Sequence, residues 1–427
     1  EIQVYVNGEE VRETYQNYLF KHKKELSSDY SDRLKMSYYY NFCAPIVDIY
    51  TNHLFKQPVL EDWANIEDIV EARSNDIDRQ GSSICEFRKE AAEVTQLYGH
   101  SFIVCDSPQA DRIVMTQQDK IDMVLFPYYT IKHPQSVINW ALDEFGRPYW
   151  VLIEDYRDGN MDPFNYNKDK ILVKNYILWT RDEWIIFNEK YQEVSRGTHK
   201  LGRVPITCCY EKKSKRIQAF LGISFLADIA FIARDVYNAC SELKQILRDQ
   251  TFAFLALQGE ADEYDETSVG TSKGLLYPSD RNAPQYISPP SDNAQTYFEH
   301  IDRQVTKMFQ MAKLEAGSAS YEGAKVSQES GVSKAWDFNQ TNSALSQKAN
   351  NLEDAENKMW QTFAAWEGKE FEGSVMYPNE FSIQSLKDDL DQAEQVLKLN
   401  MGREFNLEIK KAIIKKKFPR MHDQDIE

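Results

Sequence analysis

Apolar residues in the second half of the chain recur at intervals of three and four, the spacing that buries one face of an α-helix. This pattern predicts three helices, at about 225–249, about 292–313 and 328–368. Short apolar runs at 251–257 and 284–290 lie between the first two helices and are bounded by turn residues, which predicts a small β excursion. A Gly/Ser-rich stretch joins the second helix to the third.

The first half of the chain begins with helical spacing. A polar helix is predicted over 13–36, and a second helix has Pro45 in its first turn and ends at Pro58. A third helix is closed by Gly99 as its C-cap, and a short buried strand at Ser101–Cys105 follows it directly. This succession predicts an αβ unit.

The period of the apolar pattern then changes to two, which is typical of half-buried strands. Alternation and turn residues predict five strands, at 128–134, 136–143, 148–155, 171–180 and 183–190. We expect an antiparallel sheet packed with the preceding helices, in a domain that ends near Pro205. The fold class predicted for the chain is α+β.

Composition is that of a folded chain. Of the 427 residues, 42% are hydrophobic and 13% are aromatic, which predicts a sizeable core and two or three structural units. The longest apolar runs are far shorter than the roughly 18–20 residues of a membrane-spanning helix. No secretory signal is visible, so we expect a cytoplasmic origin and no membrane segment.

The cysteines point to the same compartment. All six stand singly or as one adjacent pair inside apolar segments, without a CxxC motif and without a histidine at zinc-like spacing. We therefore expect buried free thiols in a reducing environment.

Net charge limits the kind of contact with nucleic acid. The formal net charge is −17, whereas tight binding to DNA depends on Lys and Arg replacing counterions. A strong nucleic-acid binder is therefore not expected. A surface past which DNA slides without adhering is compatible with this charge.

Motifs of known chemistry are missing from the sequence. There is no GxxxxGK[ST], GxSxG, HExxH or GxGxxG, and the seven histidines show no i, i+4 pairing. The carboxylates Asp388, Asp389 and Asp391 lack the glycine and terminal glutamate of a calcium loop and are interpreted as a solvated first helical turn. We predict no catalytic residue, no metal and no cofactor, and we do not expect an enzyme.

Five segments, taken with their order along the chain, carry a resemblance to a known family. They lie between about Tyr38 and Glu367 and read "YYYNFCAPIVDIYTNHLFKQPV", "EAAEVTQLYGHSFIVCDSP", "HPQSVINWALDEFGRP", "LGISFLADIAFIARDVYNACSELKQ" and "SQESGVSKAWDFNQTNSALSQKANNLEDAENKMW". Each segment alone is weak evidence. Their order resembles the portal protein family of tailed bacteriophages, the head-to-tail connector ring at one capsid vertex.

The resemblance implies a portal-type fold with a fixed division of the chain. The parts implied are an α+β wing (1–222), a first stem helix (223–249), a small β-containing clip (250–291), a second stem helix (292–313), a tunnel loop (314–327), a long wing or tunnel helix (328–368) and a helical, crown-like C-terminal part (369–427). That last part is shorter than in many relatives.

The resemblance also implies a function and partners. The chain would form a homo-oligomeric ring, expected to be a dodecamer, whose channel serves viral genome packaging, retention and ejection of double-stranded DNA. The partners implied are the terminase large subunit, head-completion or neck proteins, and the major capsid and scaffold proteins. The location implied is the virion, at the capsid vertex, with the host cytoplasm during assembly.

Candidate site residues follow from this layout. Lys313, Tyr321 and Lys325 are candidates for contact with DNA in the channel, and ordinary solvent-exposed loop residues are the alternative. The acidic clip residues are candidates for docking a basic surface of the motor or neck, with a solvated loop as the alternative; they are Glu260, Asp262, Glu263, Asp265 and Glu266.

Two other classes of function stay open from the sequence. One is a metal-dependent nucleic-acid-processing enzyme, which requires acids that converge in space. The other is a capsid-assembly adaptor without a channel.

Overall fold

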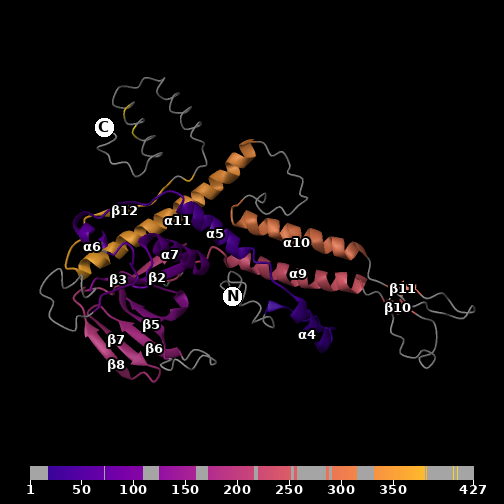
Figure 1. The fold of residues 1–427 in the computed structure, drawn as a ribbon, viewed down its shortest axis with the longest axis horizontal. Helices are drawn as coiled ribbons and strands as arrows, with labels where there is room; N and C mark the ends of the chain where they lie inside the picture. The colour runs from indigo at the N-terminus through magenta and orange to yellow at the C-terminus, as the bar shows by residue number, and fades with distance from the viewer. Residues whose placement is uncertain are drawn as a thin grey trace, which may run out of the picture. The chain divides into compact units, whose positions relative to one another are not determined.

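The computed structural model describes residues 18–71, 73–108, 125–159, 172–215, 220–251, 254–256, 285–287, 291–314, 331–379, 381, 407 and 411 (Figure 1). Contacts between Cα atoms group the chain into two units. Unit 1 comprises Glu1–Ile46 and Leu226–Val326, and unit 2 comprises Val47–Phe225 and Ser327–Glu427. Helices and antiparallel sheets occur together, so the predicted α+β class is confirmed.

Unit 2 contains two larger antiparallel sheets. The first has the strand order β3-β2-β9, from β2 (His100–Asp106), β3 (Tyr128–Lys132) and β9 (Ile206–Tyr210). The second is a meander whose strands pair in chain order: β4 (Val137–Leu142), β5 (Pro148–Asp158), β6 (Leu172–Trp179), β7 (Glu183–Asn188) and β8 (Glu193–Thr198). Short turns join β4 to β5 and β6 to β7, and the predicted antiparallel sheet is confirmed.

The remaining elements of unit 2 are helices and one short ladder. Helix α5 (Cys43–Leu54) spans the boundary between the units, and the helices wholly inside unit 2 are α6 (Glu67–Glu71), α7 (Ile84–Tyr98) and α11 (Gly331–Trp366). The 3-10 helices η1 (Ala64–Ile66) and η2 (Pro134–Ser136) are short. Strand β1 (Leu60–Asp62) pairs antiparallel with β12 (Ser374–Met376), with Glu61 opposite Val375.

Helix α7 shows why the local sequence folds as it does. The Ser83 hydroxyl accepts a hydrogen bond from the Glu86 backbone N–H, while the Glu86 carboxylate accepts one from the Ser83 N–H at 2.8 Å, which forms a capping box. At the other end Gly99 has a φ of 86°, the left-handed conformation that ends a helix. Strand β2 begins at the next residue, so the predicted αβ unit is confirmed.

The C-terminus of α7 lies against a distant segment at residues 222–224. A Cβ atom built on Gly222 would lie 2.0 Å from the Gly99 carbonyl oxygen, so the two backbones are in direct contact. Beside them the Ser224 hydroxyl donates to the carbonyl of Leu97 at 2.6 Å. The segment therefore satisfies a carbonyl that the end of a helix leaves without an internal partner.

One hydrophobic core cluster of unit 2 lies where its two larger sheets meet. Buried apolar side chains from both sheets and from adjoining loops contact one another there: Phe102, Val104, Val137, Val151, Ile153, Trp179, Val204, Ile206 and Phe220. Trp366, the last residue of α11, packs against this cluster. Burial of large apolar side chains supplies the main stabilisation of such a core.

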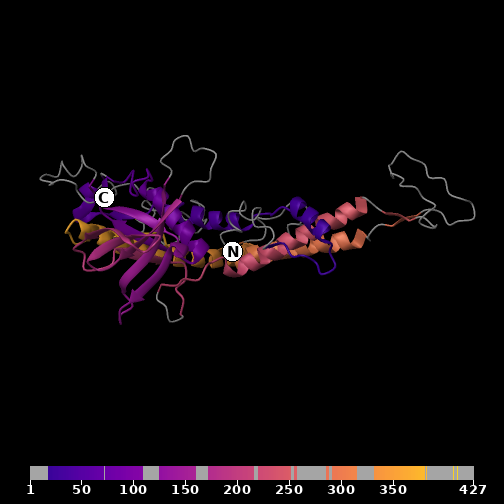
Figure 2. The same cartoon turned by 90° about the horizontal axis from the view of Figure 1, so that it is seen from below.

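Unit 1 contains two long helices and a short hairpin. Helices α9 (Ala227–Thr251) and α10 (Ser291–Met311) lie side by side in both views (Figures 1 and 2). Strands β10 (Phe254–Ala256) and β11 (Gln285–Ile287) pair antiparallel between them in the chain. Both helices and the β excursion predicted from the sequence are confirmed.

The structure also corrects three sequence predictions. The polar helix predicted over 13–36 is wrong over much of its described part, because α4 spans only Ser27–Met36. The chain before α4 is turned back, and the Arg33 guanidinium donates both to Glu25 at 2.8 Å and to the Phe20 carbonyl at 2.6 Å. The long helix α11 lies within the predicted range 328–368, and residues 328–330 at its predicted start are outside the described residues.

Two further corrections concern the end of the first sheet domain and the cysteines. Strand β9 begins one residue after Pro205, so the sheet continues past the predicted end of that domain. The six cysteines form no disulfide with one another, but Cys85 is exposed, so the prediction that all are buried is wrong there. Cys85 lies in the first turn of α7, where the helix side away from the core faces solvent.

None of the described helices is long and apolar enough to cross a membrane.

Candidate functional site

The α9–α10 pair of unit 1 is built around a narrow apolar face. The β10–β11 hairpin joins the two helices, so they run antiparallel. Their buried side chains are mostly small or aliphatic: Ile229, Ala230, Ala233, Val236, Ala239 and Leu243 from α9, and Ala294, Met308 and Phe309 from α10. Alanines at such positions allow close approach of two helix axes.

Polar contacts join the same two helices at their exposed rim. Asp235 on α9 is 3.0 Å from His300 Nε2 and accepts from Gln304 Nε2 at 3.0 Å, both on α10. One helical turn or more away, the Tyr297 hydroxyl donates to Glu242 at 2.8 Å. This hydrogen bond, with partial burial, raises the pKa of Tyr297 to about 12.

Helix α10 ends at a defined stop. The Leu314 N–H donates to the Phe309 carbonyl at 2.9 Å, and the Lys313 N–H donates to the Gln310 carbonyl at 2.9 Å. Lys313 has a φ of 56°, so the pattern is a Schellman motif with a lysine in the left-handed position. Leu314 is buried and Lys313 is exposed. The lysine side chain is therefore presented to solvent where the predicted tunnel loop begins.

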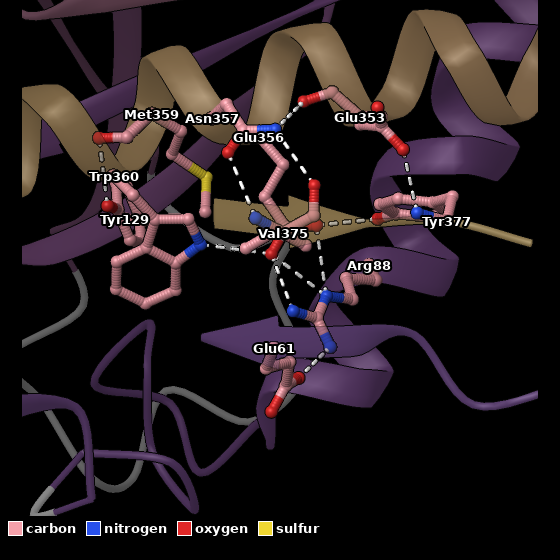
Figure 3. Close-up of polar contacts among 10 residues, drawn as sticks. All are labelled: Glu61, Arg88, Tyr129, Glu353, Glu356, Asn357, Met359, Trp360, Val375 and Tyr377. Atoms are coloured by element: carbon pink, nitrogen blue, oxygen red, sulfur yellow. Dashed lines mark hydrogen bonds and ion pairs between the residues drawn. The ribbon is translucent and has the colours of Figure 1, made fainter. Parts of the chain in front are cut away.

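Helix α11 of unit 2 is held by a buried ion pair (Figure 3). Glu356 accepts from Arg88 of α7, with Nη2 at 2.6 Å and Nε at 3.0 Å, and the two side chains are 5% and 7% exposed. Glu61 of β1 forms a second ion pair with the same guanidinium. Burial alone lowers the pKa of Arg88, but the charge and hydrogen bonds of Glu356 outweigh it and raise that pKa.

Further donors fill the remaining positions around Glu356 (Figure 3). Trp360 Nε1 donates to it at 3.0 Å and the Tyr377 hydroxyl donates at 2.6 Å. Burial, and then the neighbouring charge of Glu356, raises the pKa of Tyr377 well above its usual value. A carboxylate surrounded in this way has its acceptor capacity occupied, as a buried charge requires.

The side-chain amide of Asn357 on α11 forms two hydrogen bonds with the backbone of strand β12, as a neighbouring strand would. Its Nδ2 donates to the Val375 carbonyl at 2.9 Å, and its Oδ1 accepts from the Val375 N–H at 3.0 Å (Figure 3). The neighbouring Glu353 carboxylate accepts from the Tyr377 N–H at 2.8 Å. These contacts fix the short β1–β12 ladder against the helix.

A second buried cation, Lys348, holds α11 about two turns nearer its N-terminus than Glu356 does. Its ammonium forms an ion pair with Glu211 and lies over two aromatic rings, 4.0 Å from the centroid of Phe225 and 5.0 Å from that of Tyr50. The lysine side chain is 4% exposed. Cation–π contacts gain strength when the cation is removed from water in this way.

Of the candidate site residues predicted from the sequence, Lys313 is the one that lies among the described residues. Lys313 lies at the end of α10, as its place in the sequence predicts. Tyr321 and Lys325 lie outside the described residues, as do Asp388, Asp389 and Asp391. The same holds for the five acidic clip candidates Glu260, Asp262, Glu263, Asp265 and Glu266. Their proposed roles stay predictions.

Sequence reasoning missed the residues that hold α11. Glu356 and Lys348 stand on the apolar stripe of the helix: Glu356 is four residues after Leu352, and Lys348 is three after Leu345. A charge in such a position is a signal of a buried ion pair, because an unpaired charge there is costly. The partners Arg88 and Glu211 could not be identified from this signal.

Metal chemistry has no visible site in the part of the chain that the structure describes. No three or more His, Cys, Asp or Glu side chains come together there in a way that could hold an ion.

The comparisons with other proteins bear mainly on unit 1 and α11. Residues 225–367 match the model of a family described as a domain of unknown function (DUF4055). The match begins just before α9 and ends one residue after α11, so it covers the helix pair, its hairpin and the anchored helix. The comparison with curated proteins finds no match.

Proposed function

We propose that the protein is a subunit of a homo-oligomeric ring, a portal-type connector through which double-stranded DNA passes. The observation that carries the proposal is the element order of 225–367: an antiparallel helix pair bearing a β hairpin, then a 36-residue helix fixed in an α+β unit. This is the order that the resemblance to phage portal proteins implies for stem, clip and tunnel helix. The same stretch is the part matched as one family domain.

Exposed apolar side chains on the helix pair support an oligomer. Phe231 of α9 is 59% exposed and Phe298 of α10 is 47% exposed. Isolated apolar residues on a surface are common, but helices arranged in a ring would cover such residues with the neighbouring subunit. The net charge of −17 supports a channel past which DNA slides without being held.

The roles of the candidate residues follow from this proposal. Lys313 begins the segment that would face the channel, with Tyr321 and Lys325 further along it. Strands β10 and β11 pair with each other, and the acidic stretch around Glu263 lies between them in the sequence. That stretch would dock the packaging motor and later the neck.

Electron microscopy of the purified full chain tests the ring. We expect class averages of closed rings with a central hole, and we expect Phe298→Glu to reduce the ring fraction strongly. Arg303→Glu, which alters an exposed residue of the same helix, is the matched control and should leave the ring fraction within about twofold. Circular dichroism establishes that both variants keep their helix content.

Three outcomes would contradict the proposal. Only monomers or dimers at every salt and protein concentration would exclude a ring-forming subunit. Closed assemblies without a central hole would favour an adaptor without a channel. Cleavage of DNA by the chain with magnesium or manganese would favour a metal-dependent enzyme.

A further inference from the structure

A cavity of about 500 Å³ lies in unit 2. Its walls come from the β4–β5 turn, the β6–β7 turn, the stretch 202–210 that leads through β9, Phe220, and the last two to three turns of α11. Cavities of this size hold a whole small molecule rather than a single ion.

Positive charge dominates the lining. Four cationic side chains line the cavity, from four different segments: Arg147, Arg181, Arg203 and Lys358. Asp143 is the single carboxylate among the lining residues. The whole chain has 67 acidic and 50 basic residues, so the positive charge of the lining is opposite in sign to the net charge of the chain.

Two of the arginines are held in place. Arg181 Nη2 is 2.7 Å from Asp143 Oδ2, and its guanidinium lies 5.2 Å from the ring centroid of Tyr149. Backbone N–H groups, that of Arg147 first, and the Arg181 guanidinium lower the pKa of Asp143. Arg203 Nη2 donates to the Gln361 carbonyl at 2.9 Å, which ties it to α11. Such contacts reduce the ordering cost of binding a ligand.

The other two cations have no carboxylate partner among the described residues. Arg147 lies over the ring of Phe145, with its guanidinium carbon 5.7 Å from the centroid, and Lys358 is exposed on α11. Four cationic side chains and one carboxylate, Asp143, line the cavity, so positive charges exceed negative charges there by three. That excess is available to a ligand from solution.

The buried residues of the lining are mainly apolar or carry a hydroxyl group. Val204, Ile206 and Phe220 belong to the core cluster of unit 2 and also line the cavity. Thr207 and Thr362 contribute buried hydroxyl groups. A ligand that fits has a strongly anionic part and a part that accepts apolar contact.

We propose that this cavity binds a phosphorylated small molecule of nucleotide size, with its phosphates at the arginines and Lys358. Arginine presents a planar fork of donors that suits phosphate oxygens, and several arginines can share one polyphosphate. A bare peptide carboxylate offers only two oxygens, so it would leave most of these donors without an acceptor. The proposal stands on the cavity alone and does not depend on the ring.

Isothermal titration calorimetry of the full chain with ATP tests the site. We expect ATP and inorganic pyrophosphate to bind and adenosine, which lacks phosphate, not to bind. The variant Arg147→Gln/Lys358→Gln should weaken ATP binding at least about tenfold, because it removes two charge-assisted contacts. Arg157→Gln/Lys190→Gln removes one arginine and one lysine from exposed positions outside the cavity and should bind ATP as the wild type does.

Several results would overturn the proposal. One is the absence of ATP binding, and another is equal loss in the cavity variant and in the control variant. Competition by pentaglutamate as effective as that by pyrophosphate would indicate an acidic-peptide site instead. Binding of a short DNA duplex without binding of ATP would indicate a backbone contact rather than a small-molecule site. Unchanged thermal melting of both variants shows that lost binding is not lost folding.

Discussion

Helices α10 and α11 follow one another in the chain, yet they are held in opposite ways. The polar contacts of α10 lie at an exposed rim, where side chains such as His300 remain 44% exposed. The ion pairs that hold α11 are buried, and Glu356 is 5% exposed. Exposed polar contacts contribute little to stability and can be exchanged for water, whereas removing one partner of a buried ion pair leaves an uncompensated charge.

This difference indicates which helix contacts can rearrange at a low cost in free energy. A buried ion pair need not add net stability, but it penalises every position of α11 in which Glu356 and Arg88 do not meet. The rim contacts of α10 impose no such penalty. In a ring of subunits, we expect adjustment to occur between α9 and α10 before α11 shifts against its unit.

The largest effect is expected from Glu356→Ala. Removing the carboxylate leaves the buried Arg88 charge paired only with the partly exposed Glu61, which destabilises unit 2 by up to about 3–5 kcal/mol. All eight tryptophans of the chain lie in the two segments of unit 2, so fluorescence during urea unfolding reports that unit alone. Glu189→Ala, at an exposed turn, is the control and should stay within about 0.5 kcal/mol of wild type. A loss below about 1 kcal/mol at Glu356 would show that the anchor is unimportant.

An intermediate effect is expected from acid, through His100. This side chain is 6% exposed, and burial lowers its pKa to about 4. The unfolded histidine titrates near 6.5, so the stability that depends on neutral His100 is complete above about 6.5 and is lost as pH falls through 4. The loss over that window is about 3 kcal/mol.

His100→Gln separates this contribution from general acid denaturation. Glutamine keeps an acceptor for the Gly222 N–H, which lies 3.3 Å from His100 Nδ1, but it does not titrate. Between pH 6.5 and 4 the fluorescence-detected stability of the variant should fall less steeply than that of wild type. His22→Gln is the control for losing an exposed histidine. Parallel pH curves for wild type and His100→Gln would refute the assignment.

The smallest effect is expected from Asp235→Ala, the counterpart of Glu356→Ala on the helix pair. It removes two rim contacts, and because both partners are solvent-accessible the cost is at most about 1 kcal/mol. The tryptophan transition should not move, and only the far-UV circular dichroism should register the change. If Asp235→Ala costs as much as Glu356→Ala, the comparison between the two helices fails.

Much of the fold could be predicted from local patterns. Helical spacing located α7, α9 and α10 closely, because each has a continuous apolar face, and alternation located β3 to β7. Strand β8 has a single large apolar residue, Val194, and so carried no signal. The β1–β12 ladder joins segments more than 300 residues apart, and no local pattern encodes such a pairing.

The candidate sites, like the fold, could be predicted only where they depend on a local sequence pattern. Lys313 could be placed from local sequence, because it directly follows the end of the apolar stripe of α10. The anchor of α11 depends on which residues meet in space: Arg88 and Glu356 are 268 residues apart. The basic cavity likewise gathers its cations from four segments, so its charge is hidden in a sequence whose average is acidic.

The contact between Gly99 and Gly222 has a consequence for tracing the evolution of this fold. Any Cβ at either position would overlap backbone atoms of the other segment, at 2.4 Å for Gly99 and 2.0 Å for Gly222. Two glycines 123 positions apart are therefore under one steric constraint. Both precede the stretch 225–367 matched by the family model. A glycine pair at this separation, one directly after a helix and one shortly before the next long helix, is a fingerprint by which distant homologues of unit 2 could be recognised.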